Sequence, residues 1–207
     1  MNEAPRPGSP RVVVLAGSLN PTSRTDLIAT WCGRRLRECG VASAVYGGGE
    51  LAFAFYRPGG VTDPSARAYL DHIAGADGIV LVSPAYHGAP SGLLKNALDY
   101  LNELAGHERP YLHGRGVGCV AVAAGEQGAS ATIASLRTIA HALRGWPTPL
   151  GVTLAGERAT IDDDGVPAHP RAVRDLTVML GQVLTMADRA PGTLADPFAA
   201  ASGWRSA

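Results

Sequence analysis

Short, nearly unbroken runs of apolar residues alternate with amphipathic stretches along this chain, and this alternation limits its fold more than any other feature. The clearest runs are residues 12–16, 78–82, 117–123 and 150–154, and a weaker run spans residues 41–46. Because the clear runs are not polar at every second position, they predict strands that are buried on both faces. The weaker run predicts a strand near an edge of the sheet.

The segments between these runs carry apolar residues at helical spacing. The clearest stripe lies in residues 94–104, where Lys95 and Asn96 fall on the opposite face. Further stripes lie in residues 28–39, 133–143 and 173–187, and a poorer helix is expected over residues 65–74. Strands that alternate with helices predict an α/β domain with a parallel, doubly wound sheet and helices on both faces.

The size of the chain suits one such domain. It has 207 residues, of which 46% are hydrophobic and 17% are charged, so a sizeable core is expected. We expect residues 11–189 to form the domain, residues 1–10 to be a disordered N-terminal tail and residues 190–207 to be a flexible C-terminal tail.

Charge and hydropathy exclude several classes of function. The formal net charge is zero, which gives no electrostatic footprint for nucleic acid or for an anionic membrane. A neutral chain also differs from a strongly acidic electron carrier, which docks on basic partners through its charge. No apolar run approaches the roughly 20 residues of a membrane helix, and the N-terminus lacks the pattern of a signal peptide. A cytoplasmic protein is therefore expected.

Cysteine and aspartate patterns give no sign of a metal or disulfide site. The three cysteines are odd in number and form no C-x-x-C pair, so Cys32 and Cys39 are expected to be ordinary buried thiols. The run Asp162-Asp163-Asp164 precedes a glycine and predicts the solvated turn of a small hairpin. Arg and Lys are spread too evenly along the sequence to predict a pocket for a 2′-phosphate.

A hydroxyl-rich loop follows the first predicted strand and opens a helix. Residues 17–25 read Gly-Ser-Leu-Asn-Pro-Thr-Ser-Arg-Thr. The N-terminus of a helix offers free N–H groups and a positive dipole end, which suit a phosphate. Neither G-x-x-x-x-G-K-[ST] nor G-x-G-x-x-G is present, so a terminal monophosphate is favoured over a triphosphate or a dinucleotide. Plain helix capping by Ser or Thr is the alternative.

Two more unusual loops follow predicted strands. Residues 83–92 read Ser-Pro-Ala-Tyr-His-Gly-Ala-Pro-Ser-Gly, which predicts a rigid rim that can lie along a planar ring. Residues 124–129 read Ala-Gly-Glu-Gln-Gly-Ala, and their small side chains leave room for that ring and a second one stacked on it. The alternatives are a packing histidine at position 87 and an ordinary strand-to-helix turn. In open α/β sheets, ligands bind outside the carboxyl ends of the strands, which is where all three loops lie.

Together the loops resemble the NADPH-dependent FMN reductase family, which also includes quinone, azo and chromate reductases and alkanesulfonate-type flavin reductases. The matching stretches are Leu15-Ala16-Gly17-Ser18 with Ser23-Arg24-Thr25, and Pro84-x-Tyr86-His87-Gly88-x-Pro90-x-Gly92-x-Leu94-Lys95-Asn96-Ala97-x-Asp99. The similarity spans about residues 11–186. Relatives often have two glycines where this chain has Glu126-Gln127.

The resemblance implies a flavodoxin-like, five-stranded parallel sheet in the order 2-1-3-4-5, with FMN at its carboxyl edge. It implies that NADPH, or NADH instead, reduces the flavin, and that the chain forms a homodimer or homotetramer. The FMN phosphate would lie on the first loop and the ring on the other two. The implied cofactor-binding residues are Gly17, Ser18, Ser23, Arg24, Thr25, Pro84, Ala85, Tyr86, His87, Gly88, Gly125, Gln127 and Gly128.

The function expected from the resemblance is an NAD(P)H-dependent FMN reductase. Hydride would pass from nicotinamide C4 to flavin N5 with no catalytic side chain required, because the chemistry belongs to the flavin. Reduced flavin would then be supplied to a partner monooxygenase. The alternatives are a quinone-, azo- or chromate-type reductase that retains its FMN, and a non-enzymatic FMN electron carrier. A hydrolase is disfavoured because no G-x-S-x-G elbow is present.

Overall fold

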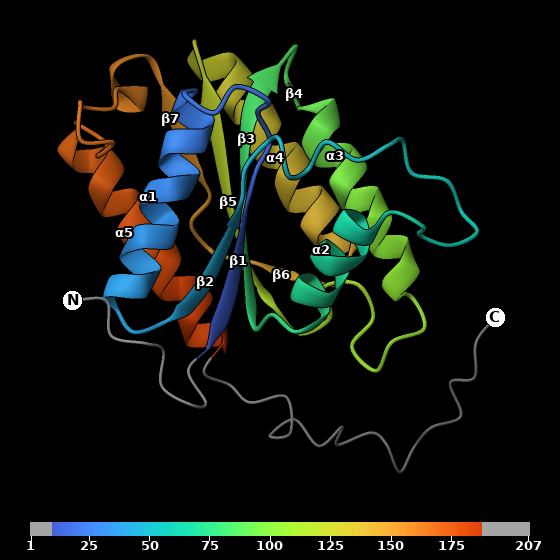
Figure 1. Cartoon of the computed structure of the whole chain (residues 1–207). Coiled ribbons are helices and arrows are strands. Elements are labelled where there is room, and N and C mark those ends of the chain that lie inside the picture. The colour runs from blue at the N-terminus through green and yellow to red at the C-terminus, as the bar shows by residue number, and fades with distance from the viewer. Residues whose placement is uncertain (1–9, 188–207) are drawn as a thin grey trace.

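The computed structural model describes residues 10–187, so the predicted tails, apart from Pro10, lie outside the described residues. Strands and helices alternate through most of this range (Figure 1). The elements in chain order are β1 (Arg11–Ala16), α1 (Arg24–Glu38), β2 (Ala42–Tyr46), α2 (Pro64–Ala74), β3 (Gly78–Tyr86), β4 (Ala89–Pro90), α3 (Gly92–Asp99), the 3-10 helix η1 (Tyr100–Leu104), β5 (Gly116–Ala123), α4 (Glu126–Ala142), β6 (Trp146–Pro147), β7 (Val152–Ala155), the 3-10 helix η2 (Gly156–Ala159) and α5 (Pro170–Ala187).

The predicted doubly wound α/β architecture is confirmed, but the predicted five strands in the order 2-1-3-4-5 are wrong in detail. Within residues 10–187 the sheet has seven strands, in the order β2-β1-β3-β5-β6, with β7 also beside β5 and β4 beside β3. All pairs are parallel except β3 with β4. The predicted strand at residues 150–154 corresponds to β7, whereas the short strand β6 was not predicted; between the two lies Pro149, which has no N–H to donate to a ladder.

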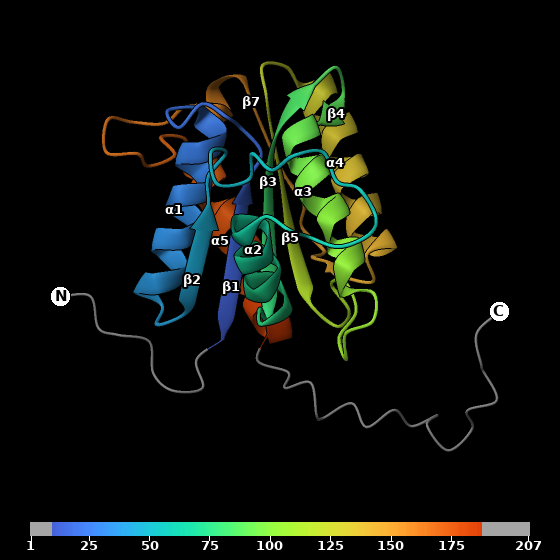
Figure 2. The ribbon, with the colours of Figure 1, turned by 45° about the vertical axis from the view of Figure 1, so that its right-hand side comes forward.

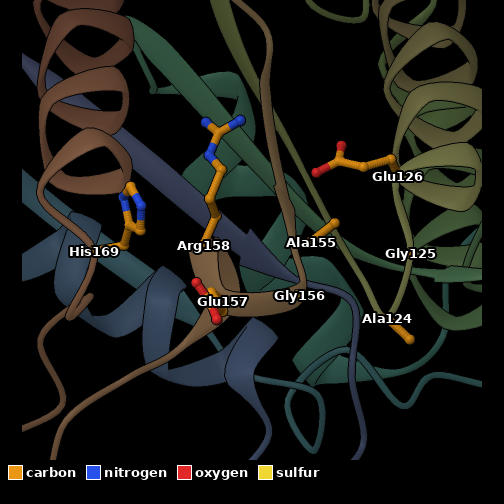
Figure 3. Close-up of a pocket in the computed structure, with 8 residues that line it drawn as sticks. All are labelled: Ala124, Gly125, Glu126, Ala155, Gly156, Glu157, Arg158 and His169. Carbon is orange, nitrogen blue, oxygen red and sulfur yellow. The ribbon is translucent and has the colours of Figure 1, made fainter.

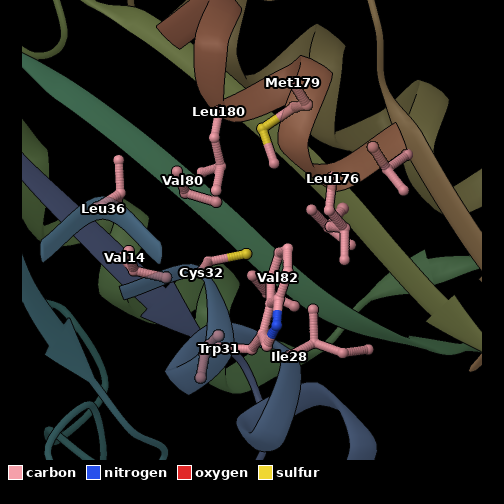
Figure 4. Close-up of a cluster of buried hydrophobic side chains, with 14 of the residues drawn as sticks. Val14, Ile28, Trp31, Cys32, Leu36, Val80, Val82, Leu176, Met179 and Leu180 are labelled. Atoms are coloured by element: carbon pink, nitrogen blue, oxygen red, sulfur yellow. The ribbon is translucent and has the colours of Figure 1, made fainter. Parts of the chain in front are cut away.

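Helices cover both faces of the sheet (Figures 1 and 2). On one face, α1 and α5 pack on the strands and enclose a core of Val, Leu, Ile, Trp and Met side chains, shown in Figure 4. On the other face, α2, α3 and α4 enclose a second core, in which Tyr69 is fully buried and donates its hydroxyl to the Ala97 carbonyl at 3.0 Å. Both faces of the central strands are therefore buried, as their unbroken apolar character predicts.

The amino edge of the sheet is tied together by a fully buried arginine. The guanidinium of Arg115 donates to the carbonyls of Ala74, Ala76 and Tyr111, at 2.6, 2.9 and 3.1 Å. Tyr111 has a φ of 53° and Arg144 a φ of 63°, and the Arg144 guanidinium lies 5.2 Å from the centre of the Tyr111 ring. These two strained residues therefore support each other through a cation–π contact.

Of the two cysteines predicted to be buried, one is buried in the structure and the other is exposed. Cys32 is buried, and burial raises the pKa of its thiol to about 12, so the thiol stays protonated at neutral pH. The prediction for Cys39 is wrong, because α1 ends at Glu38 and the chain turns away from the core, which leaves Cys39 exposed as the C-cap. In the range 10–187, none of the helices is long and apolar enough to cross a membrane.

Candidate functional site at the carboxyl edge of the sheet

The structure brings the three unusual loops into one continuous surface. They follow β1, β3 and β5, which are adjacent, parallel strands. The first loop packs closely against the second at Gly17, where an added Cβ would lie only 2.7 Å from Ser91 Oγ at the start of α3. The third loop approaches the second at Gly128, where an added Cβ would be in van der Waals contact with the Ala85 Cβ, at 3.7 Å. Small residues thus hold the three loops side by side.

Local side-chain hydrogen bonds hold the first loop in its conformation. Asn20 Oδ1 accepts from the N–H and the hydroxyl of Thr22, at 3.0 and 2.8 Å. The buried Ser18 hydroxyl accepts from the Asn20 N–H at 3.3 Å. Ser23 is the N-cap of α1, and its hydroxyl accepts from the Asp26 N–H at 3.2 Å. The capping alternative is therefore correct for Ser23, but it accounts for only one of the free donors of the helix.

Two donors of the first turn of α1 stay available. The backbone N–H groups of Arg24 and Thr25 make no hydrogen bond to the part of the chain that the structure describes. The Arg24 side chain is exposed, whereas Thr25 is buried. Unpartnered N–H groups at a helix N-terminus, together with a free guanidinium, form the donor set that a phosphate monoester requires.

A glycine-rich turn after β2 supports this loop. A Cβ at Gly48 would lie only 1.6 Å from the Ser18 carbonyl oxygen, so no residue with a side chain fits there without moving the backbone. Beside it, burial raises the pKa of the Asp26 carboxyl, the Glu50 charge raises it further, and a hydrogen bond from Gly48 lowers it. One carboxylate therefore lies in an unfavourable position close to the candidate phosphate site.

The second loop is a β-hairpin rather than an irregular rim. Strand β3 continues through Pro84 to Tyr86 and then pairs antiparallel with β4. The two residues at the tip, His87 and Gly88, have φ values of 53° and 80°. Two positive φ values are typical of a type I′ turn, which matches the twist of the paired strands. The hairpin leaves the ring of Tyr86 56% exposed, and His87 is exposed beside it.

The third loop is shorter than the sequence predicts. Only Ala124 and Gly125 lie between β5 and α4, and the predicted site residues Gln127 and Gly128 lie in the first turn of α4. Gly125 is the N-cap and provides no side-chain cap, so the first N–H groups of α4 stay free of such a bond. A Cβ at Gly125 would meet no atom within 4 Å, so this position is open.

A cavity of about 330 Å³ extends from the third loop toward the end of β7 (Figure 3). Its lining residues are Ala124, Gly125, Glu126, Ala155, Gly156, Glu157, Arg158 and His169. Neither Arg158 nor His169 is among the site residues predicted from the sequence. The signal that could have found Arg158 is its position just after the predicted strand 150–154, because ligands bind at the carboxyl ends of such strands.

The acidic turn at residues 162–165 is held by its own carboxylate. Asp162 Oδ1 accepts from the N–H groups of Asp164 and Val166, at 3.1 and 2.8 Å. Over the described range 10–187, no group of three or more His, Cys, Asp or Glu side chains is arranged to hold a metal ion. The functional surface is therefore the three-loop edge and its neighbouring cavity.

This edge fits a ligand that has a phosphate tail and a flat ring. The tail has the free donors of α1, and the ring has a shelf bounded by the hairpin on one side and the open Gly125 on the other. The exposed Tyr86 ring and the small side chains around it suit stacking and edge contacts with an aromatic system.

Comparisons with known proteins agree with this geometry. Residues 10–159 match the profile of the family described as NADPH-dependent FMN reductase. An NAD(P)H-dependent FMN reductase of Schizosaccharomyces pombe is 32% identical over 106 residues, which cover 45% of this chain and 51% of that protein. An NADPH azoreductase of a Bacillus species is 34% identical over 98 residues, which cover 47% of this chain and 52% of that protein. The chain thus matches about half the length of these relatives.

Solved structures show the same fold at lower sequence identity. The flavoenzyme FerB, an NAD(P)H:acceptor oxidoreductase of Paracoccus denitrificans, is similar with a TM-score of 0.67 at 18% identity, over 86% of this chain and 96% of that one. RosB, solved with a bound 8-demethyl-8-formylriboflavin-5′-phosphate intermediate, is similar with a TM-score of 0.68 at 16% identity, over 87% of this chain and 79% of that one. At these identities the likeness establishes the flavodoxin-like fold.

Proposed function

Since this chain belongs to the NADPH-dependent FMN reductase family, we propose that it catalyses the reduction of FMN by NADPH, with NADH as the alternative donor. One observation carries the proposal: three loops that are far apart in sequence form one surface with a free donor set at one end and an open shelf at the other. FMN, when bound, supplies the hydride-accepting chemistry.

The first loop would hold the phosphate of FMN. Arg24 contributes a guanidinium and its backbone N–H, and Thr25 contributes a second N–H. The buried Ser18 and the N-cap Ser23 shape the turn, while Gly17 lets it pack against α3. Each charge-assisted hydrogen bond from such a group contributes about 1.5–3 kcal/mol.

The hairpin and the start of α4 would hold the ring. Pro84 and Ala85 form the base of the shelf, Tyr86 and His87 form its outer rim, and Gly88 closes the turn. At the other side, Gly125 leaves space, and the positive end of the α4 dipole with Gln127 and Gly128 provides N–H donors for oxygens of the ring. No acidic or basic side chain is required to transfer a proton.

The direct test mixes the purified protein with FMN and NADPH and follows the absorbance of the nicotinamide. We expect it to fall only when protein, FMN and NADPH are all present, and titration with FMN to be saturable. If NADPH is not consumed with FMN or with any common electron acceptor, the reductase assignment is wrong. Consumption also excludes the alternative of a carrier that takes electrons only from a protein partner.

We further propose that FMN exchanges with solvent and that reduced FMN is delivered to a partner monooxygenase. The exposure of Leu19, at 66%, and of Tyr86, at 56%, supports an open ring shelf from which flavin can leave. A protein that is colourless after dialysis, with rates that saturate in FMN, fits this role. The NADPH azoreductase among the relatives favours a second candidate, a reductase of azo compounds, quinones or chromate that retains its flavin. A protein that stays yellow through dialysis would indicate that candidate instead.

We also propose a homodimer or homotetramer. Phe55 is 86% exposed, lies in the segment between β2 and α2, and lines a hollow with Tyr100 at the end of α3. Exposed aromatic side chains of this kind are enriched at protein interfaces. Light scattering at increasing protein concentration gives the mass directly, and a strictly monomeric mass at all concentrations would reject this proposal.

A further inference from the structure

An aspartate lies in the first turn of the helix whose N-terminus would hold the flavin phosphate. Asp26 is the acidic residue of that turn of α1. It directly follows Arg24 and Thr25, whose backbone N–H groups make no hydrogen bond in the described range 10–187. The positive end of the helix dipole stabilises a carboxylate at this position, as it would stabilise a phosphate. Asp26 therefore competes with a bound phosphate for the same favourable field.

The turn after β2 holds the Asp26 carboxyl beside the phosphate loop. In Figure 1 the chain after β2 runs next to the loop after β1. A Cβ at Gly47 would lie 3.2 Å from Asp26 Oδ1, and a Cβ at Gly48 would lie only 1.6 Å from the Ser18 carbonyl oxygen. Gly48 also donates a backbone hydrogen bond to the Asp26 carboxyl. The same turn thus packs against both the carboxyl and the loop.

A second carboxylate belongs to this turn. Glu50 Oε2 accepts from the Gly47 N–H at 2.9 Å, which keeps the Glu50 charge near Asp26. Burial raises the pKa of Asp26, and the Glu50 charge raises it further. Neither carboxyl forms an ion pair with a basic side chain within residues 10–187. The protein therefore leaves the negative charge behind the phosphate loop uncompensated.

The phosphate loop itself offers little positive charge against it. Arg24 is the one basic residue among residues 17–25, and its side chain is exposed. A phosphate monoester carries close to two negative charges at neutral pH. A bound phosphate would thus meet one guanidinium in front and the carboxylates of Asp26 and Glu50 behind. Attraction from the backbone donors and from Arg24 is therefore opposed by repulsion from within the same site.

We propose that Asp26, with Glu50 behind it, weakens the binding of the flavin phosphate and so lets FMN exchange rapidly with solvent. This inference rests on the proposed reductase function, in which FMN enters and leaves the site. The repulsion acts on the phosphate and not on the ring, so it lowers the affinity for FMN without lowering the affinity for riboflavin. Asp26 is thus a specificity-determining residue that lies away from the reacting atoms.

The test compares Asp26→Asn with the wild type in titrations with FMN and with riboflavin, followed by flavin fluorescence. Asparagine removes the charge but keeps an oxygen that can accept from Gly48. We expect the variant to bind FMN about three- to tenfold more tightly and to release it correspondingly more slowly in stopped-flow measurements. Riboflavin should bind the variant and the wild type equally.

Two further variants make the test specific. Glu50→Gln keeps an acceptor for the Gly47 N–H, and it should tighten FMN binding by a smaller factor because Glu50 is exposed. This variant also tests the inference if Asp26→Asn does not fold. The matched control is Glu38→Gln, which removes an exposed carboxylate from the last residue of α1 and should leave both flavin affinities unchanged.

The outcomes separate this inference from the reductase function. If Asp26→Asn and Glu50→Gln bind FMN no more tightly than the wild type, the inference is wrong. It is also wrong if FMN and riboflavin gain affinity equally, or if Glu38→Gln tightens FMN binding, because the effect is then not specific to the phosphate site. Unaltered FMN binding in the variants of a protein that consumes NADPH overturns the inference alone. If the variants tighten FMN binding as expected but NADPH is not consumed, the phosphate site stands and the reductase function fails.

Discussion

At the amino edge of the sheet the protein satisfies its own polar groups, whereas at the carboxyl edge it leaves several of them without partners. Arg115 donates to three carbonyls before β3 and β5, and the strained Tyr111 and Arg144 pack on each other. At the opposite edge, the N–H groups of Arg24 and Thr25 have no partners in the described range 10–187.

Each edge also holds residues with positive φ values, and the two sets differ in their surroundings. At the carboxyl edge, His87 has a φ of 53° and is exposed at the tip of its hairpin. At the amino edge, Tyr111 and Arg144 pack on each other, whereas at the carboxyl edge His87 and Gly88 form an exposed hairpin turn. The amino edge thus contributes to stability, and the unpaired donors at the carboxyl edge support the proposal that it binds a ligand.

The strongest test of this contrast removes the buried guanidinium. Arg115→Met would remove the donor to the carbonyls of Ala74 and Tyr111 and leave the Ala76 carbonyl with only the longer bond from Arg109, so the free energy of unfolding should fall by about 3–5 kcal/mol. Urea denaturation measures it. Arg109→Met is the matched control on the same edge, because Arg109 lies 3.8 Å from Asp77 and is partly exposed, and it should cost no more than about 1 kcal/mol. Equal losses would mean that burial of Arg115 has no special role.

The second test addresses the carboxyl edge. Arg24→Ala should weaken FMN binding by about 1.5–3 kcal/mol, because one charge-assisted contact to the phosphate is lost, and stability should not change because the side chain is exposed. Titration followed by flavin fluorescence measures the affinity. Riboflavin, which lacks the phosphate, should bind both proteins equally. An unaltered FMN affinity would rule out the phosphate role of Arg24.

A third test asks whether an unpartnered polar group always marks a binding edge. The hydroxyl of Thr132, on the buried face of α4, has no partner in the described chain, whereas the Thr148 hydroxyl is buried and donates to the Leu150 carbonyl at 2.9 Å. Thr132→Val should raise the free energy of unfolding by about 1 kcal/mol, and Thr148→Val should lower it by a similar amount. Thermal unfolding distinguishes the two signs, and a loss in both variants would mean that Thr132 has a partner after all.

The smallest expected effect concerns a carboxylate at the carboxyl edge. Because burial and the Glu50 charge raise the pKa of Asp26 above its ordinary value of 3.8, the folded protein keeps this proton to a higher pH than the unfolded chain does. Ionisation of Asp26 therefore destabilises the fold as the pH rises from 3.8 through the raised pKa. Asp26→Asn should remove this part of the pH dependence, as measured by urea midpoints below and above that window. An unchanged pH profile would contradict the assignment.

Local sequence patterns were sufficient for most of the fold and for the place of the site. Unbroken apolar runs predict the central strands because each is buried on both faces, and parallel strands bring their carboxyl ends together. The extension of β3 could not be predicted in this way. Ser83 and Pro84 pair with Ala121 and Val122 of β5, so the strand continues through a proline because of a partner that is distant in sequence.

Other features depend on how distant segments meet. The glycines around Glu126 suggested a loop, but α4 begins at that residue and takes the first of them, Gly125, as its N-cap. The ion pair between Arg158 and Asp175 could not be predicted either, because a hairpin and the first turn of α5 separate the two residues in the sequence. Only the fold brings them together.

The most distinctive stretch of the sequence, residues 94–99, has a structural role that affects how relatives should be compared. The Asn96 side chain donates to the carbonyls of Phe53 and Ala54 and accepts from the Tyr56 N–H, while Leu94 and Ala97 are buried. This stretch therefore fastens the chain segment after β2 onto α3. Two proteins that share it share this structural contact, whereas the proposed ligand-facing positions, such as His87, lie outside it. Transfer of a substrate name between such proteins should thus be decided by those positions and not by the shared stretch.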